Sequence, residues 1–168
     1  MYPVVETFGA SWTSLISCSP GSFIFFCYIC AVEAFEKKVR ASFARQTFMA
    51  TLGAEMSSVA QGAVEIRFAF SENLSQQNGF VHAGAITSIL DSACGYAALS
   101  VAPPHAEVLS VEFKVNLLAP AAGEAFAARA TVKRAGKTIA VCAADAFAIS
   151  KDKEKLIATM LATMMYKS

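Results

Sequence analysis

The chain has 168 residues, with 14 lysines and arginines against 13 aspartates and glutamates, and a formal net charge of +1. This length suits one compact domain with a short extension, and a hydrophobic share of 55% excludes a disordered chain. The near-neutral balance argues against nucleic-acid binding, which normally requires a strong basic excess. The apolar share exceeds what a monomer of this size needs, so we expect a second copy to cover part of the surface.

The hydrophobic N-terminal extension, residues 1–32, differs in composition from the domain at 33–168. It contains no basic residue, and its apolar run at 23–32 is shorter than the roughly 20 residues of a bilayer span. A secretory signal places basic residues before the apolar run, whereas here they follow it. We predict a dispensable extension of a cytoplasmic protein, with a membrane anchor as the alternative.

The cysteines form no metal-binding pattern. Their number is odd, one close pair is spaced as Cys-x-x-Cys, and no second pair or histidine follows it at ligand spacing. We therefore expect no metal site and interpret them as small apolar residues in a reducing cytosol. The five are Cys18, Cys27, Cys30, Cys94 and Cys142.

The first predicted elements are a helix and a strand. An amphipathic helix is expected from 33 to about 50, because aromatic and branched apolar residues recur at steps of three to five among charged ones. A half-buried strand follows at 64–70, where apolar and polar residues alternate. The polar stretch 71–81, which contains Asn78-Gly79, is predicted to be a loop.

A buried helix and four strands account for the rest. Residues 84–99 are apolar on nearly every side, which is typical of a helix inside a core, and Pro103-Pro104 prevents its continuation. Strands are predicted at 109–117, 126–132, 139–149 and 156–166, with turns at Ala135-Gly136 and 151–154. This order predicts an α+β fold: an antiparallel sheet wrapped around a central helix, preceded by an N-terminal helix. The last strand, apolar on both faces, suggests that the outer side or edge of the sheet meets a second subunit.

The start of the central helix and one acid within it carry the predicted chemistry. Free N–H groups in the first turn, at Ala83 and Gly84, lie at the positive end of the helix dipole and can stabilise an oxyanion. Asp91 stands in the middle of this apolar helix, where an unpaired carboxylate is costly, so a functional role is favoured.

These two features are too far apart to act together within one chain. Seven residues separate Gly84 from Asp91, which places them roughly 10 Å apart along the helix axis. One small reacting group cannot readily touch both. We therefore expect a symmetric dimer in which the oxyanion site of one chain meets Asp91 of its partner.

Two features of the sequence are typical of one family: the motif His82-Ala-Gly with Asp91 nine residues after the histidine, and the later segment 108–120. In both, the chain resembles the PaaI-type hotdog-fold thioesterases, which hydrolyse acyl-CoA thioesters. The resemblance covers about residues 33–167. It implies a homodimer, or a dimer of such dimers, with no cofactor beyond the coenzyme A of the substrate. The site residues that it implies are Ala83 and Gly84 as oxyanion amides, Asp91 as nucleophile or general base, Gln76 as a polar amide that places the water or carbonyl, and Ser110 as a hydroxyl that holds the water. The chain departs from the family pattern at Ala83, where glycine is commonest, but a backbone N–H is retained.

Several of these residues have a structural alternative. Gln76 could be an ordinary loop amide. His82 is a candidate for a direct part in the chemistry, and its alternative is to orient the turn by capping a carbonyl. His105 is expected to be solvated. The basic residues Lys133, Arg134 and Lys137 could bind the phosphates of coenzyme A, as in some relatives, or simply form a basic hairpin.

Two other functions remain open from the sequence. The first is a non-catalytic acyl-CoA-binding protein that keeps the fold. The second is an enoyl-CoA hydratase, which would require an Asp and a His as acid–base partners on a loop, whereas 71–81 contains no acid beyond Glu72.

Overall fold

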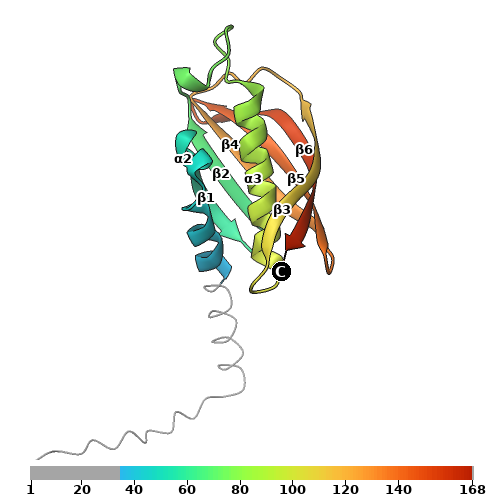
Figure 1. Cartoon of the computed structure of the whole chain (residues 1–168). Coiled ribbons are helices and arrows are strands. Elements are labelled where there is room, and N and C mark those ends of the chain that lie inside the picture. Colours follow the sequence, from blue (N-terminus) through green and yellow to red (C-terminus); the bar gives the residue numbers. More distant parts are fainter. Residues whose placement is uncertain (1–34, 168) are drawn as a thin grey trace, which may run out of the picture.

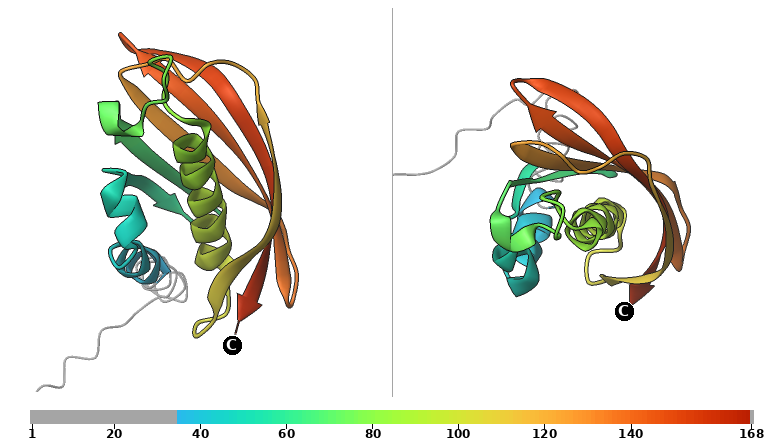
Figure 2. Two further views of the ribbon diagram at one scale, coloured as in Figure 1. Left: turned by 45° about the horizontal axis from the view of Figure 1, so that its top comes forward. Right: turned by 90° about the horizontal axis from the view of Figure 1, so that it is seen from above.

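The computed structural model describes residues 35–167, so the predictions for the extension at 1–32 and for its three cysteines lie outside the described residues. One antiparallel sheet of six strands, in the order β1-β2-β4-β5-β6-β3, curves around a long helix, α3. Figure 2 shows α3 end-on inside the curve of the sheet, with the N-terminal helical segment beside it. The predicted α+β architecture is confirmed. The elements after the first helix, at 35–43, are α2 (Thr47–Thr51), β1 (Glu55–Ala60), β2 (Ala63–Ala69), η1 (Glu72–Leu74), α3 (Ala83–Val101), β3 (Glu107–Leu117), β4 (Ala125–Ala135), β5 (Ile139–Ser150) and β6 (Lys153–Lys167).

Helix α3 forms the centre of the core. Most of its side chains are buried against the sheet, and it ends at Val101, just before Pro103-Pro104, as predicted. By length and apolar composition alone α3 could cross a membrane, but here the sheet buries most of it. The residues of β2, β4, β5 and β6 that face it alternate along each strand with residues on the outer face.

The prediction of a single helix from 33 to about 50 is wrong for the second half of that range. The helix ends at 43. After it, the N–H groups of Arg45 and Gln46 donate to carbonyls three residues back, those of Ser42 and Phe43, rather than four residues back as in an α-helix. Gln46 is extended, and α2 begins after it in a new direction. This break turns Met49 into the core and leaves Phe48 exposed, although Phe48 continued the apolar periodicity of the sequence.

Strand β1 was not predicted from the sequence. It forms a hairpin with β2 through a turn at Gly62, whose φ is +76°. The strand pairing shifts register between Met56 and Ser58, which interrupts the alternation of apolar and polar residues. Because that alternation is the signal by which a strand is recognised, the bulge concealed this one.

Strand β3, rather than the last strand β6, lies at one edge of the sheet, and β1 lies at the other. β6 is paired on both sides, with β5 and β3, and it begins directly after a tight turn at Lys151 and Asp152, both with positive φ. β3 has eleven residues and pairs only with β6 among the described strands. Its exposed apolar side chains include Leu109, Val111, Phe113 and Leu117. A long unpaired edge of this composition is a surface that proteins normally cover.

A charged cluster on the outer face of the sheet joins three strands. Arg129 on β4 donates through Nη1 and Nη2 to Glu154 on β6, at 2.7 and 2.6 Å, and through Nε to Glu65 on β2. The guanidinium carbon lies 4.8 Å from the centre of the Phe147 ring. Burial alone would raise the pKa of Glu65, but hydrogen bonds from Arg67 and its other partners lower it to about 2.

We expect Arg129→Met to lower the free energy of unfolding by about 1 kcal/mol at pH 7, since the partly exposed cluster is screened by solvent. Because the folded-state pKa of Glu65 lies below its ordinary value of 4.5, its contribution is present above that value and is lost as the pH falls toward 2. The difference in unfolding free energy between wild type and Arg129→Met should therefore become smaller in acid. Urea unfolding at pH 7 and at about pH 2.5 measures it, with the exposed Lys133→Met on the same strand as control. A deficit independent of pH would assign the effect to packing on Phe147.

Candidate active site

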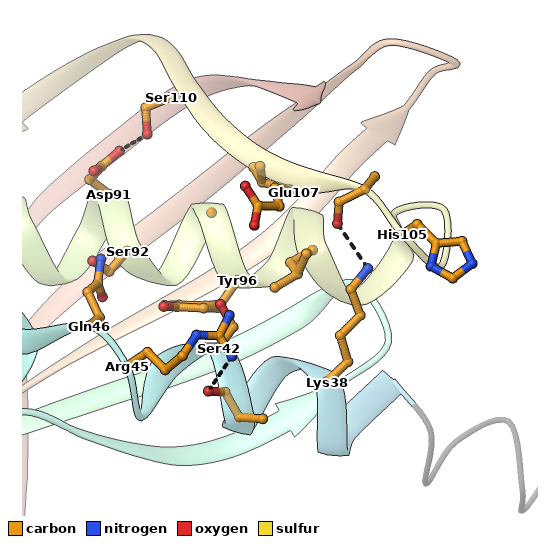
Figure 3. A pocket seen from close by; sticks show the side chains of 15 residues that line it. Lys38, Ser42, Arg45, Gln46, Asp91, Ser92, Tyr96, His105, Glu107 and Ser110 are labelled. Carbon is orange, nitrogen blue, oxygen red and sulfur yellow. Dashed lines mark hydrogen bonds between the residues drawn. The ribbon is translucent and has the colours of Figure 1, made fainter. Parts of the chain in front are cut away.

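Asp91 lies half-buried at the middle of α3, beside the edge strand β3. The hydroxyl of Ser110, on β3, donates a hydrogen bond of 2.7 Å to Asp91 Oδ1 (Figure 3). Within residues 35–167, Oδ2 of the same carboxylate has no hydrogen-bond partner. The structure thus brings together two of the predicted site residues, which are 19 positions apart in the sequence, and leaves one carboxylate oxygen open for chemistry.

Asp91 and Ser110 line a cavity of about 540 Å³, a volume suited to a small organic ligand. Its walls come from three parts of the chain: the helix at 35–43 with the turn after it, the exposed side of α3, and the segment that leads into β3. His105 is exposed, as expected, but also lines this cavity. The polar lining residues besides Asp91 and Ser110 are Lys38, Ser42, Arg45, Gln46, Ser92, Tyr96, His105 and Glu107.

Tyr96 brings a buried phenol to this cavity. Its ring packs edge-on against Phe43, with 5.5 Å between ring centres. Burial raises the pKa of Tyr96, and Ser42 and Arg45 offset only part of that effect. The phenol therefore stays protonated at neutral pH. Tyr96 and the other wall residues from 38 to 46 were not predicted from the sequence, because nothing in their local pattern distinguishes a cavity wall from an ordinary amphipathic face.

The start of α3 is capped by His82. Its Nδ1 accepts a hydrogen bond of 2.9 Å from the Gly84 N–H, and its backbone carbonyl accepts one from Ala85. His82 thus caps an amide rather than a carbonyl. Of the two amides predicted to hold an oxyanion, Gly84 is already engaged by His82, whereas the Ala83 N–H has no partner within residues 35–167.

Ala83 opens onto a second cavity, of about 650 Å³, together with Gln76 and His82. Gln76 Oε1 accepts a hydrogen bond of 2.9 Å from the Asn78 N–H, so the side-chain oxygen shapes the loop at 76–79. Apolar residues from the ends of β3 and β6 and the segment between β3 and β4 complete this cavity: Leu117, Leu118, Ala119, Pro120, Ala121 and Ile157. Glu72, the one acid of residues 71–81, is exposed and does not line this cavity.

One chain therefore divides most of the predicted site residues between two separate cavities, and Gly84 lines neither of them. Asp91 and Ser110 line the first cavity, whereas Gln76, His82 and Ala83 line the second. Arg134 and Lys137 are exposed on the hairpin between β4 and β5 and line neither cavity.

The described cysteines and acids give no sign of a reactive thiol or metal centre. Cys94 and Cys142 are buried and free, and burial raises the pKa of both thiols, that of Cys142 to about 11. Between residues 35 and 167, no three His, Cys, Asp or Glu side chains gather closely enough to hold a metal ion.

Comparison with known proteins agrees with this architecture. The family model that matches, over residues 78–154, is that of the Thioesterase superfamily. A thioesterase family protein from Silicibacter pomeroyi is 52% identical, with a TM-score of 0.77 over 79% of this chain and 97% of that one. The E. coli PaaI protein from the phenylacetic acid degradation operon, at 18% identity, shares the fold, with a TM-score of 0.73 over 82% of this chain and 96% of that one.

A curated relative, a candidate esterase of Halobacterium salinarum, is 32% identical over 95 residues. That match covers 54% of this chain and 62% of the relative, so the chain spans less than two thirds of its length. The fold, the family match and the extensive identity to the Silicibacter pomeroyi protein lead to one conclusion. The chain belongs to the thioesterase superfamily and has the hotdog fold.

Proposed function

We propose that this protein hydrolyses the thioester of an acyl-CoA, releasing a free acid and coenzyme A. The observation that carries the proposal is the Asp91–Ser110 pair: the one charged residue of α3, oriented by a hydroxyl and open to a ligand-sized cavity. Membership of the thioesterase superfamily supports the reaction type.

The Ala83 N–H is the proposed oxyanion donor. It lies at the first position of α3, at the positive end of the helix dipole, and opens onto a cavity. A thioester carbonyl oxygen placed against it gains negative charge as the carbon becomes tetrahedral, and a preorganised amide stabilises that charge. His82 and Gly84 then have a positioning role, because their hydrogen bond holds the turn that presents Ala83.

Asp91 performs the attack in one of two ways. As a general base, it accepts a proton from water while the water oxygen bonds to the carbonyl carbon. The tetrahedral intermediate then collapses with cleavage of the C–S bond, and the proton passes from Asp91 to the leaving thiolate. As a nucleophile, it forms a mixed anhydride that water then hydrolyses. In both routes the leaving thiolate ends as the thiol of coenzyme A. In a single turnover in ¹⁸O-labelled water, solvent oxygen in the Asp91 side chain identifies the anhydride route with water attacking the Asp91 carbon, because the general-base route never labels this side chain.

The site is proposed to form between two chains. Asp91 and Ala83 lie in different cavities and eight positions apart on one rigid helix, about 12 Å at 1.5 Å per residue. Two α3 helices running antiparallel across a two-fold axis would bring Asp91 of one chain beside Ala83 of the other. The unpaired β3 edge, with its exposed apolar side chains, is the surface that such a dimer would cover.

The basic hairpin is the proposed contact for the phosphates of coenzyme A. Lys133, Arg134 and Lys137 are exposed around one turn, and none of them forms an ion pair within residues 35–167. Their charges are therefore available to a phosphate.

The reaction is tested with aryl, short-chain and medium-chain CoA esters, followed by a colorimetric thiol reagent. We expect thiol release that depends on enzyme concentration for at least one ester. With crotonyl-CoA, enoyl absorbance is followed in parallel with free thiol. Loss of that absorbance without thiol release would indicate a hydratase, and tight binding of CoA esters without either signal would indicate a binding protein.

A further inference from the structure

Lys38 links the N-terminal helix to the segment between α3 and β3. Its Nζ donates hydrogen bonds of 3.0 Å to both the Pro103 and the Ala106 carbonyl oxygens. Within the described residues it has no carboxylate partner, and burial lowers its pKa. We refer to these two hydrogen bonds as the Lys38 bridge.

The Lys38 bridge joins two walls of the Asp91 cavity. Residues 41–46 form one wall and residues 105–108 another, with α3 between them (Figure 3). The bridge spans both at the end away from Asp91. The distance between these walls limits the width of a ligand beside Asp91.

Other contacts hold the helix to the rest of the domain without this bridge. Val39 is fully buried, Phe43 packs against Tyr96, and Arg40 Nη1 donates to the Met56 carbonyl at 3.0 Å. Loss of the bridge should therefore free the wall to move without detaching the helix. Asp91 and Ser110 lie on α3 and β3, so the reacting groups would keep their positions.

We infer that Lys38 is a positioning residue that determines which acyl groups the enzyme accepts, by fixing the width of the acyl cavity. This inference rests on the proposed function, because it treats the Asp91 cavity as the place of the acyl group. The bridge holds the cavity in its narrow form, in which a compact acyl group fits and a long one must push the two walls apart.

The test compares wild type, Lys38→Met and Lys38→Arg across a series of straight-chain esters from acetyl-CoA to decanoyl-CoA. In Lys38→Met, the ratio of kcat/KM for decanoyl-CoA to that for acetyl-CoA should rise about tenfold, mostly through KM for the long ester. Lys38→Arg, whose guanidinium can also donate to two carbonyls, should restore the wild-type ratio. Lys37→Met, at an exposed position on the same helix, is the matched control.

An unchanged ratio in folded Lys38→Met, as judged by its thermal unfolding, would overturn the inference. If this variant does not fold, Lys38→Gln, which keeps a donor too short to reach both carbonyls, replaces it. Affinities of non-hydrolysable thioether analogues, measured in an Asp91→Asn background, give the same ratio without turnover. If wild type hydrolyses no ester, the proposed function fails, whereas the affinity ratio still decides the role of Lys38.

Discussion

Replacing Asp91 by asparagine is expected to lower kcat/KM for a CoA ester by about 10³-fold. Asparagine has nearly the same shape, and its side-chain oxygen can still accept the hydrogen bond from Ser110. An amide can neither take the proton of water nor form the mixed anhydride. Steady-state thiol release measures the loss, and calorimetry with a CoA ester should show that binding remains.

Ser110, which donates the hydrogen bond to Asp91, provides the matched comparison. Ser110→Ala removes only the hydroxyl that orients the carboxylate, so we expect a smaller loss of about tenfold in kcat. Turnover of Asp91→Asn equal to that of wild type would remove Asp91 from the mechanism. Equal losses in the two variants would mean that the pair acts as one unit rather than as a base and its support.

Replacing Ala83 by proline is expected to lower kcat by about 10²- to 10³-fold, because it deletes the N–H that holds the oxyanion. The position permits this test. Ala83 is the first residue of α3, where proline is well tolerated, and His82 before it is already extended, with φ −62° and ψ 137°. The helix should therefore persist. Kinetic assays and thermal unfolding of the same preparation measure both properties.

Ala83→Gly, which keeps the amide, should retain activity. Full activity of folded Ala83→Pro would exclude this N–H as the oxyanion donor. Co-expression of Asp91→Asn and Ala83→Pro chains then tests whether the site is shared. With equal random pairing, half of the dimers are mixed, and each contains one site with both groups intact. Activity should recover to about one quarter of the wild-type level, whereas a site within one chain would show no recovery.

The large elements of this protein follow from local sequence patterns. Helix α3 is recognisable because its residues are apolar all round, and β2, β4 and β5 because apolar and polar residues alternate. Two features of the structure differ from what the local sequence pattern predicts. A bulge interrupts the alternation in β1, and the helix break before α2 turns Met49 rather than Phe48 toward the core.

Some features of the candidate site can likewise be predicted from the sequence, and others cannot. Asp91 is conspicuous in the sequence because a carboxylate interrupts an apolar helix, and the histidine that caps the helix start is visible beside it. The engagement of the Gly84 N–H by His82 Nδ1 is not visible, because it depends on a side-chain rotamer. The walls formed by Lys38 and Tyr96 come from segments far apart in the chain.

By itself, then, the amino-acid sequence determined a sheet around a buried helix and the residue on that helix most able to perform chemistry. Both follow from periodicity and from the cost of placing a charge among apolar neighbours, which are properties of short segments. Only the tertiary structure decided that β3 forms one edge of the sheet, that Ser110 hydrogen-bonds to Asp91, and that Ala83 opens onto a different cavity. Strand order and cavity walls arise from contacts between distant segments, and no local pattern encodes them.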